Sequence, residues 1–176
     1  GASHDVGQKG LKDADKEEIV NLLSQHGKVF ISSEAALPDS LLKYKIKIPA
    51  DKMHDALAFA HFFVGEGATM ASECAMLGTP AVYINSMIAE TINEQQEYGL
   101  LYHFTSSEGV LNKIKELIDN TNLKEEWQQK RMTLLNDKID VSEFTFWYVR
   151  NYPDSLKTMK ENPGYQEKFK KALILS

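Results

Sequence analysis

The sequence predicts an α/β fold in which a parallel sheet carries helices on both faces. Short apolar runs alternate with helical segments along most of the chain, and no internal repeat or low-complexity linker interrupts them. The stretch from Phe62 to Asn85 has the order strand, glycine turn, helix, strand, which is one βαβ unit. A chain of 176 residues is long enough to enclose one such core.

The first 60 residues predict two helices and two short strands. The first helix follows from apolar residues at helical spacing, with a capping-box-like start and a glycine stop. These residues are Leu11, Ile19, Leu22 and Leu23, with Asp15 and Glu18 at the start and Gly27 at the end. Runs at 28–32 and 44–48 predict strands, the second an outer strand because Pro49 ends it. Asp51 is expected to cap a helix that runs through Ala60.

The central unit consists of an apolar run at 62–64, a glycine turn at 65–67, a helix at 69–77 and a second apolar run at 81–84. Gly78 is expected to close the helix. Glycines let a backbone approach an anion closely and adopt angles that other residues resist. The first turn of the following helix offers unpaired N–H groups and the positive end of its dipole. The unit therefore predicts a phosphate-binding corner.

The last third of the chain predicts one more strand, at 101–104, followed by helices. Ser106 or Ser107 is expected to cap the next helix, and two further helices are expected at about 123–139 and 142–152. The glycine turn is not followed by a third glycine at the dinucleotide spacing, nor by Gly-Lys-Ser/Thr. This pattern therefore disfavours a dinucleotide-dependent dehydrogenase and a P-loop NTPase.

Three motifs carry a resemblance to a known family. Gly67 to Glu73, Leu77 to Ala81 and Asn93 to Gln96 resemble the donor-binding half of GT-B glycosyltransferases, including the peptidoglycan N-acetylglucosaminyltransferase and UDP-N-acetylglucosamine 2-epimerase. The shared features are a glycine-rich turn, a helical Ser-Glu, a Gly-x-Pro and a downstream glutamine pair. The chain as a whole is similar to a GT-B-like family of archaea and bacteria that carries the motifs at 2–11 and 28–34.

The resemblance implies a Rossmann-like nucleotide-sugar domain over residues 1–141 and an aromatic C-terminal helix and tail over 142–176. It also implies a diphosphate cradle at the glycine turn, formed by Gly65, Gly67, Ala68 and Thr69, with a second set of donors at Ser3 in the first turn. Ile48 and Pro49 would cradle the base, and Glu73 would accept hydrogen bonds from the ribose. The side-chain amides of Gln95 and Gln96 would bind the sugar hydroxyls. A solvated or salt-bridged helix glutamate and an ordinary surface helix remain the alternatives for Glu73 and for the glutamine pair.

No catalytic residue is identified, and three side chains are weak candidates: His4, Asp5 and Glu66. The adjacent His4 and Asp5 suit general acid–base chemistry, although a hydrogen-bonded turn explains them too. The charge of Glu66 would oppose a pyrophosphate unless it points away, and it could instead hold a sugar hydroxyl or a cation. His54, His61 and His103 are expected as packing residues, so no metal site and no cofactor are predicted.

The chain opens on polar residues, where a Rossmann-like domain should have its central first strand. We therefore expect a first strand to be absent and the chain to be the C-terminal half of a two-domain protein. The tail is expected to pack against the absent N-terminal domain, because Phe144, Phe146, Trp147, Tyr148 and Tyr152 are too aromatic for a free surface helix. Self-association of the isolated chain, or a strand formed by residues 172–175, is expected otherwise.

Composition narrows the function classes. A net charge of −5 argues against a general binder of nucleic acid or membrane surfaces. The longest apolar run, from Ala56 to Val64, is too short to cross a bilayer. The single cysteine, Cys74, excludes an internal disulfide, is expected as a small buried residue and fits the cytoplasm.

Two function classes therefore remain open. The first is an enzyme half, either of a GT-B transferase using a UDP-sugar or of a sugar-nucleotide epimerase. The second is a non-catalytic sugar-nucleotide-binding or interaction module.

Overall fold

A computed structural model describes residues 11–87 and 89–170. The chain divides into two compact units, one ending at Gln128 and the other beginning at Gln129. The residue boundary expected between 141 and 142 falls inside the second unit. The predicted Ser3, His4 and Asp5, and the strand proposed at 172–175, lie outside the described residues.

The first unit is built on a parallel sheet of three strands in the order β1–β2–β3, which confirms the α/β, Rossmann-like class. The strands are β1 (Phe63–Gly65), β2 (Ala81–Ile84) and β3 (Leu101–Phe104). Their register pairs Phe63 with Ala81, and Ala81 with Leu101. Every residue of β2 is buried, as expected for the central strand of a sheet that is covered on both faces.

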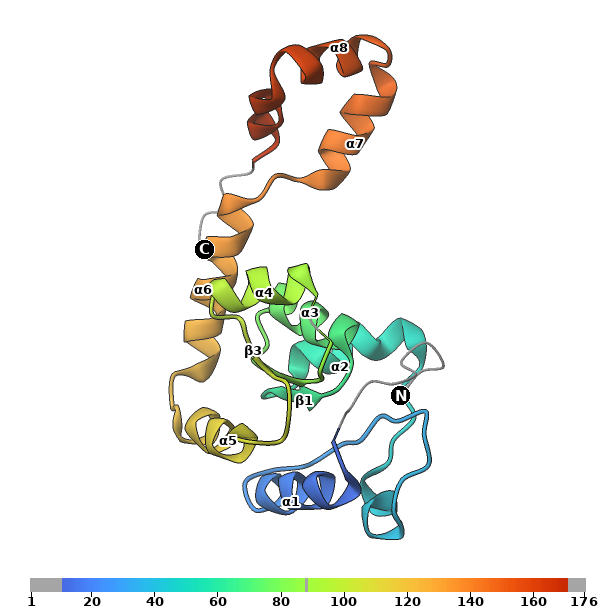
Figure 1. The fold of residues 1–176 in the computed structure, drawn as a ribbon, viewed down its shortest axis with the longest axis vertical. Coiled ribbons are helices and arrows are strands. Elements are labelled where there is room, and N and C mark those ends of the chain that lie inside the picture. The colour runs from blue at the N-terminus through green and yellow to red at the C-terminus, as the bar shows by residue number, and fades with distance from the viewer. Residues whose placement is uncertain (1–10, 88, 171–176) are drawn as a thin grey trace. The chain divides into compact units, whose positions relative to one another are not determined.

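Helices connect and cover these strands. They are α1 (Asp13–Ser24), α2 (Met53–Phe59), α3 (Ala68–Leu77), α4 (Glu90–Glu97), α5 (Val110–Asp119) and α6 (Leu123–Asp137), with the 3₁₀ segments η1 (Asp39–Tyr44) and η2 (Ala50–Lys52). The two crossovers β1–α3–β2 and β2–α4–β3 run in the same direction, which places α3 and α4 on one face. Figure 1 shows them on one side of the strands, with α1 and α5 on the other.

The strands predicted at 28–32 and 44–48 are not formed, and a single bridge takes their place, so this part of the prediction is wrong. Only Ile31 and Lys45 pair, in parallel. The Ile31 N–H donates to the Tyr44 carbonyl at 2.8 Å, and the Ile46 N–H donates to the Ile31 carbonyl at 3.0 Å. Phe30 is 64% exposed, so the segment lacks the two-sided burial that sustains a parallel strand.

Two predicted N-caps are wrong, and the first is that of α2, where Lys52 rather than Asp51 holds the N-cap position. Neither Ser106 nor Ser107 is the N-cap of α5; that position belongs to Gly109, which adopts φ +80°, a left-handed conformation that glycine tolerates. The Ser106 hydroxyl instead accepts from the Glu108 N–H. Gly78 closes α3 as predicted, again with positive φ.

Trp127 anchors α6 to the sheet of the first unit. Its side chain is 1% exposed, and its Nε1–H donates to the Leu100 carbonyl at 2.7 Å, one residue before β3. Gln128 beside it donates from Nε2 to the carbonyls of Leu77 and Gly78 at the end of α3. The start of α6 is therefore hydrogen-bonded both to the residue before β3 and to the end of α3.

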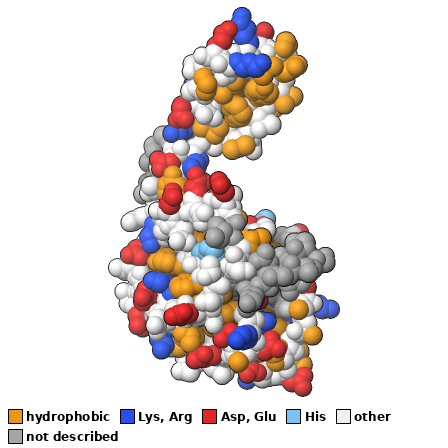
Figure 2. Space-filling view, viewed as in Figure 1, with side chains coloured by type: hydrophobic (Ala, Val, Ile, Leu, Met, Phe, Trp, Pro, Cys, Tyr) orange, Lys and Arg blue, Asp and Glu red, His pale blue; other side chains and the backbone are white. Residues whose placement is uncertain are grey.

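The second unit contains α7 (Val141–Arg150), α8 (Asp154–Glu161) and the 3₁₀ segment η3 (Pro163–Phe169). Its aromatic rings stack on one another: the Trp147 and Tyr165 centroids lie 4.8 Å apart, and Phe144 meets Phe169 edge-on at 5.5 Å. None of these rings is fully buried, and Phe146 and Tyr152 are mostly exposed. Hydrophobic side chains accordingly gather on the surface of this unit (Figure 2). The expectation that these aromatics need a cover stays a prediction.

No helix in the described part of the chain is both long and apolar enough to cross a lipid bilayer.

Candidate functional site

The candidate site lies at the carboxyl ends of the strands, where the turn after β1 leads into α3. Open parallel sheets bind ligands at this edge because the loops and helix N-termini converge there. The first helix bond of α3 joins the Ala71 N–H to the Gly67 carbonyl at 3.1 Å. The N–H groups of Ala68, Thr69 and Met70 therefore precede the intrahelical ladder and remain available as donors.

The surroundings of the two glycines of the turn, Gly65 and Gly67, differ in the space that they leave for a side chain. A Cβ added at Gly65 would come within 2.5 Å of the Phe63 ring, which lies on the same face of the strand two residues earlier. Gly67 has φ −89° and ψ 111°, an ordinary extended conformation, so the expectation that it needs unusual backbone angles is wrong. A Cβ there would meet only Met70 Cβ, at 4.0 Å. Open space, rather than backbone strain, distinguishes Gly67.

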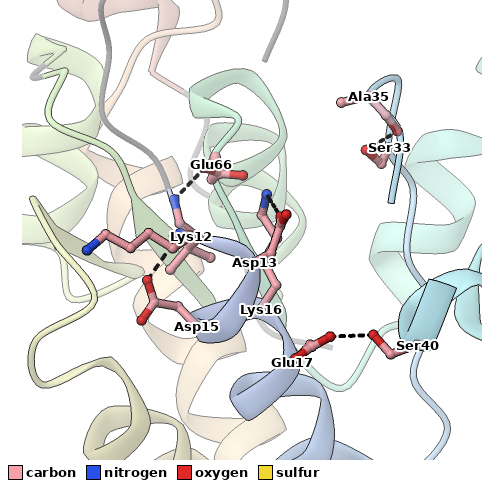
Figure 3. A network of polar contacts seen from close by, with 10 residues as sticks. Lys12, Asp13, Asp15, Lys16, Glu17, Ser33, Ala35, Ser40 and Glu66 are labelled. Carbon is pink, nitrogen blue, oxygen red and sulfur yellow. Dashed lines mark hydrogen bonds and ion pairs between the residues drawn. The ribbon is translucent and has the colours of Figure 1, made fainter. Parts of the chain in front are cut away.

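Glu66 does not present a free carboxylate to the turn. Its Oε1 accepts from the Leu11 N–H at 2.6 Å, at the entry to α1 (Figure 3). Its own carbonyl accepts from Asn85 Nδ2 at 3.1 Å. The side chain is thus held in place by a charge-assisted hydrogen bond from a backbone donor 55 residues away in the sequence.

Glu73 lies one turn into α3 and faces α2. Its Oε1 is 3.2 Å from His54 Nε2, and its side chain is 32% exposed, so the carboxylate is paired but still reachable from solvent. His54 is therefore not the packing residue expected from the sequence, since 65% of its side chain is exposed. No sequence signal pairs residues 19 apart on two different helices; only the packing of α2 against α3 does.

Ile48 and Pro49 line a pocket of about 510 Å³. The pocket opens at the end of the Ile31–Lys45 bridge and is completed by Ser32, Ser33, Glu34, Lys45, Ile46 and Lys47. Pro49 precedes η2, which continues directly into α2 and His54. Five residues of 3₁₀ and α-helical rise span roughly 10 Å, about the length of a nucleoside. The pocket and the His54–Glu73 pair therefore lie at the two ends of one short segment.

A second pocket, of about 220 Å³, lies between α1 and the start of α5. Asp15, Glu18 and Glu108 line it. Three carboxylates repel an anionic ligand, so this pocket is unsuited to a phosphate.

The predicted glutamine pair separates into two environments. Gln95 is only 7% exposed, and its Oε1 accepts from the Ser72 hydroxyl of α3 at 2.9 Å. Gln96, its neighbour on α4, is exposed. The pair is thus not an ordinary surface helix: Gln95 ties α4 to the residue next to Glu73.

Cys74 is fully buried, as expected. Burial, and to a smaller extent the adjacent Glu73 carboxylate, raises the pKa of the Cys74 thiol to about 12. The thiol stays protonated at neutral pH and serves as packing rather than as a nucleophile. Within the described residues, no group of three or more His, Cys, Asp or Glu side chains is arranged to hold a metal ion.

Comparison of the chain with protein-family models, with curated proteins and with solved structures gave no match. Sequence reasoning assigned no role to Asn85 and included Ser72 only as part of the helical Ser-Glu, because each acts through a contact with a residue distant in sequence.

Proposed function

We propose that this chain is the donor-binding half of a GT-B-type glycosyltransferase, which binds a nucleoside-diphosphate sugar, specifically a UDP-sugar, for glycosyl transfer. One observation carries the proposal. The pocket at Ile48 and Pro49 is joined through η2 and the start of α2 to His54, which contacts the Glu73 carboxylate of α3. The N-terminus of the same helix α3 comes next. They suit, in the same order, a base, a ribose and a diphosphate.

In this arrangement the N–H groups at the start of α3 would stabilise the negative charge that develops on the departing diphosphate. Preorganised donors of this kind contribute on the order of several kcal/mol to such steps. Glu73 would accept hydrogen bonds from the ribose hydroxyls, and Gln96 would face the sugar. The catalytic base of inverting GT-B enzymes commonly comes from the other half of the cleft, so we expect this chain alone to bind the donor without transferring it.

The partners follow from this assignment. A nucleotide sugar and the protein's own N-terminal domain are the proposed ones, with self-association of the isolated chain if that domain is absent. The acidic balance of the chain disfavours nucleic acid. A single buried thiol fits a reducing compartment, and we place the protein in the cytoplasm.

The direct test is calorimetry of UDP and of uridine with this chain, together with a thermal-shift panel of nucleoside diphosphates. UDP should raise the apparent stability and bind at least tenfold more tightly than uridine, because a ligand that binds the native state stabilises it. If no nucleoside diphosphate binds, the proposal is wrong. UDP release from UDP-sugars by the two-domain protein would then separate a transferase from an epimerase or a non-catalytic module.

A Gly67→Val variant tests the diphosphate position. The valine side chain would fill the open space at the turn while the backbone conformation remains allowed, so we expect at least a tenfold loss of UDP affinity. The free energy of unfolding should change by less than about 1 kcal/mol, a typical cost of changing an N-cap. Gly27→Val, at another glycine with open space, is the matched control and should leave UDP binding unchanged. Equal UDP affinity in the Gly67 variant would remove the phosphate role of the turn.

A further inference from the structure

Asn85 joins the carboxyl ends of the three strands. It follows β2 directly and is 5% exposed. Its backbone N–H donates to the Phe104 carbonyl at 2.9 Å, and its carbonyl accepts from His103 Nε2 at 2.8 Å, so both backbone groups bind β3. Its side-chain Oδ1 accepts from the Met87 N–H at 3.0 Å. The remaining side-chain group, Nδ2, reaches from the end of β2 to the turn after β1.

The bond from Asn85 Nδ2 to the Glu66 carbonyl fixes the orientation of one peptide group. The peptide between Glu66 and Gly67 is trans, so its C=O and N–H point in opposite directions. Because the Glu66 carbonyl points toward Asn85, the Gly67 N–H must point away from Asn85 and β2. Among the described residues, no hydrogen bond uses this N–H.

We infer that Asn85 is a positioning residue for the diphosphate: it holds the Glu66–Gly67 peptide so that the Gly67 N–H joins the donors of the first turn of α3. This inference rests on the proposed function and identifies the residue that preorganises its anion site. Asn85 itself does not contact the ligand. It acts through the peptide, which would otherwise be able to rotate and present its carbonyl to the phosphates.

A second contact supports the same orientation. The Glu66 side chain is held at Leu11, so residue 66 is restrained at its carboxylate and at its carbonyl. Rotation of the peptide after residue 66 would break the bond from Asn85, while the bond to Leu11 keeps residue 66 itself in place. The turn is thus preorganised by contacts from α1 on one side and from the end of β2 on the other.

The experiment compares UDP with uridine for wild type and for Asn85→Ala. The ratio of the two affinities isolates the contribution of the phosphates. We expect this ratio to fall at least tenfold in the variant, while uridine affinity changes less than threefold. Asn85→Asp supplies a second readout: its carboxylate has no donor at neutral pH, but the protonated carboxyl can donate to the Glu66 carbonyl. The ratio for Asn85→Asp should therefore recover toward that of the wild type, measured in parallel, as the pH is lowered.

The outcomes separate the two proposals. If wild type binds no nucleoside diphosphate, the proposed function and this role of Asn85 are both rejected. If wild type prefers UDP and the variant keeps the same preference, or loses UDP and uridine equally, only the positioning role is rejected. Should neither variant fold, the wild-type Gly67 amide resonance decides: it should shift with UDP and stay in place with uridine, and an unmoved resonance overturns the inference.

Discussion

Replacing Trp127 by alanine is expected to lower the free energy of unfolding by about 3–5 kcal/mol. The indole is almost entirely buried and packs 6.1 Å from the Tyr102 ring, measured between centroids. Truncation would leave a large cavity beside β3 and would also leave the buried Leu100 carbonyl without its donor. With a urea m-value of about 2 kcal/mol/M, the unfolding midpoint should drop by about 2 M. Far-ultraviolet circular dichroism would follow the transition.

One variant divides this effect into its parts, and a second variant serves as a control. Trp127→Phe keeps most of the apolar volume and loses the hydrogen bond, so it should cost about 1–3 kcal/mol, the penalty for a buried group left unpaired. Phe146→Ala removes an aromatic ring that is 65% exposed and should cost less than about 0.5 kcal/mol. If Trp127→Ala stayed within 1 kcal/mol of wild type, the indole would not be the anchor of α6.

The second large effect is expected at Glu73. Glu73→Ala should weaken UDP binding by roughly 1–3 kcal/mol, or about 5- to 150-fold, because the ribose would lose a charged acceptor. Stability should change little, since a third of the side chain is exposed and its contact with His54 is near the surface. His54→Ala is the matched control: it removes the partner and keeps the carboxylate, so most of the affinity should remain.

A ligand with a missing hydroxyl sharpens this test. If Glu73 accepts a hydrogen bond from the ribose 2′-hydroxyl, the wild-type protein should bind 2′-deoxy-UDP less tightly than UDP. The Glu73→Ala variant should then discriminate less between the two ligands. Such a cycle isolates the contact between carboxylate and hydroxyl from any general disturbance. If the substitution and the missing hydroxyl lowered the binding free energy additively, Glu73 would not contact that hydroxyl.

The sequence alone determined those strands and helices that depend on residues adjacent along the chain. The strands at 81–84 and 101–104 were predicted with their observed bounds, because short apolar runs flanked by turn residues leave little choice. The helix after the glycine turn and its closure at Gly78 were also predicted, since a glycine with positive φ is a local requirement. The parallel sheet followed from the alternation of these elements. Local chemistry was therefore sufficient for the fold class.

Only the tertiary structure decided which side chains meet. The pairing of Glu73 with His54, of Ser72 with Gln95 and of Asn85 with Glu66 joins residues on different elements, and no sequence spacing encodes such contacts. The strand predicted at 28–32 failed for the same reason: its β-branched residues favour a strand, but a strand also needs neighbours to pair with and layers to cover it. Propensity depends on neighbours along the chain, whereas pairing and burial depend on neighbours in space.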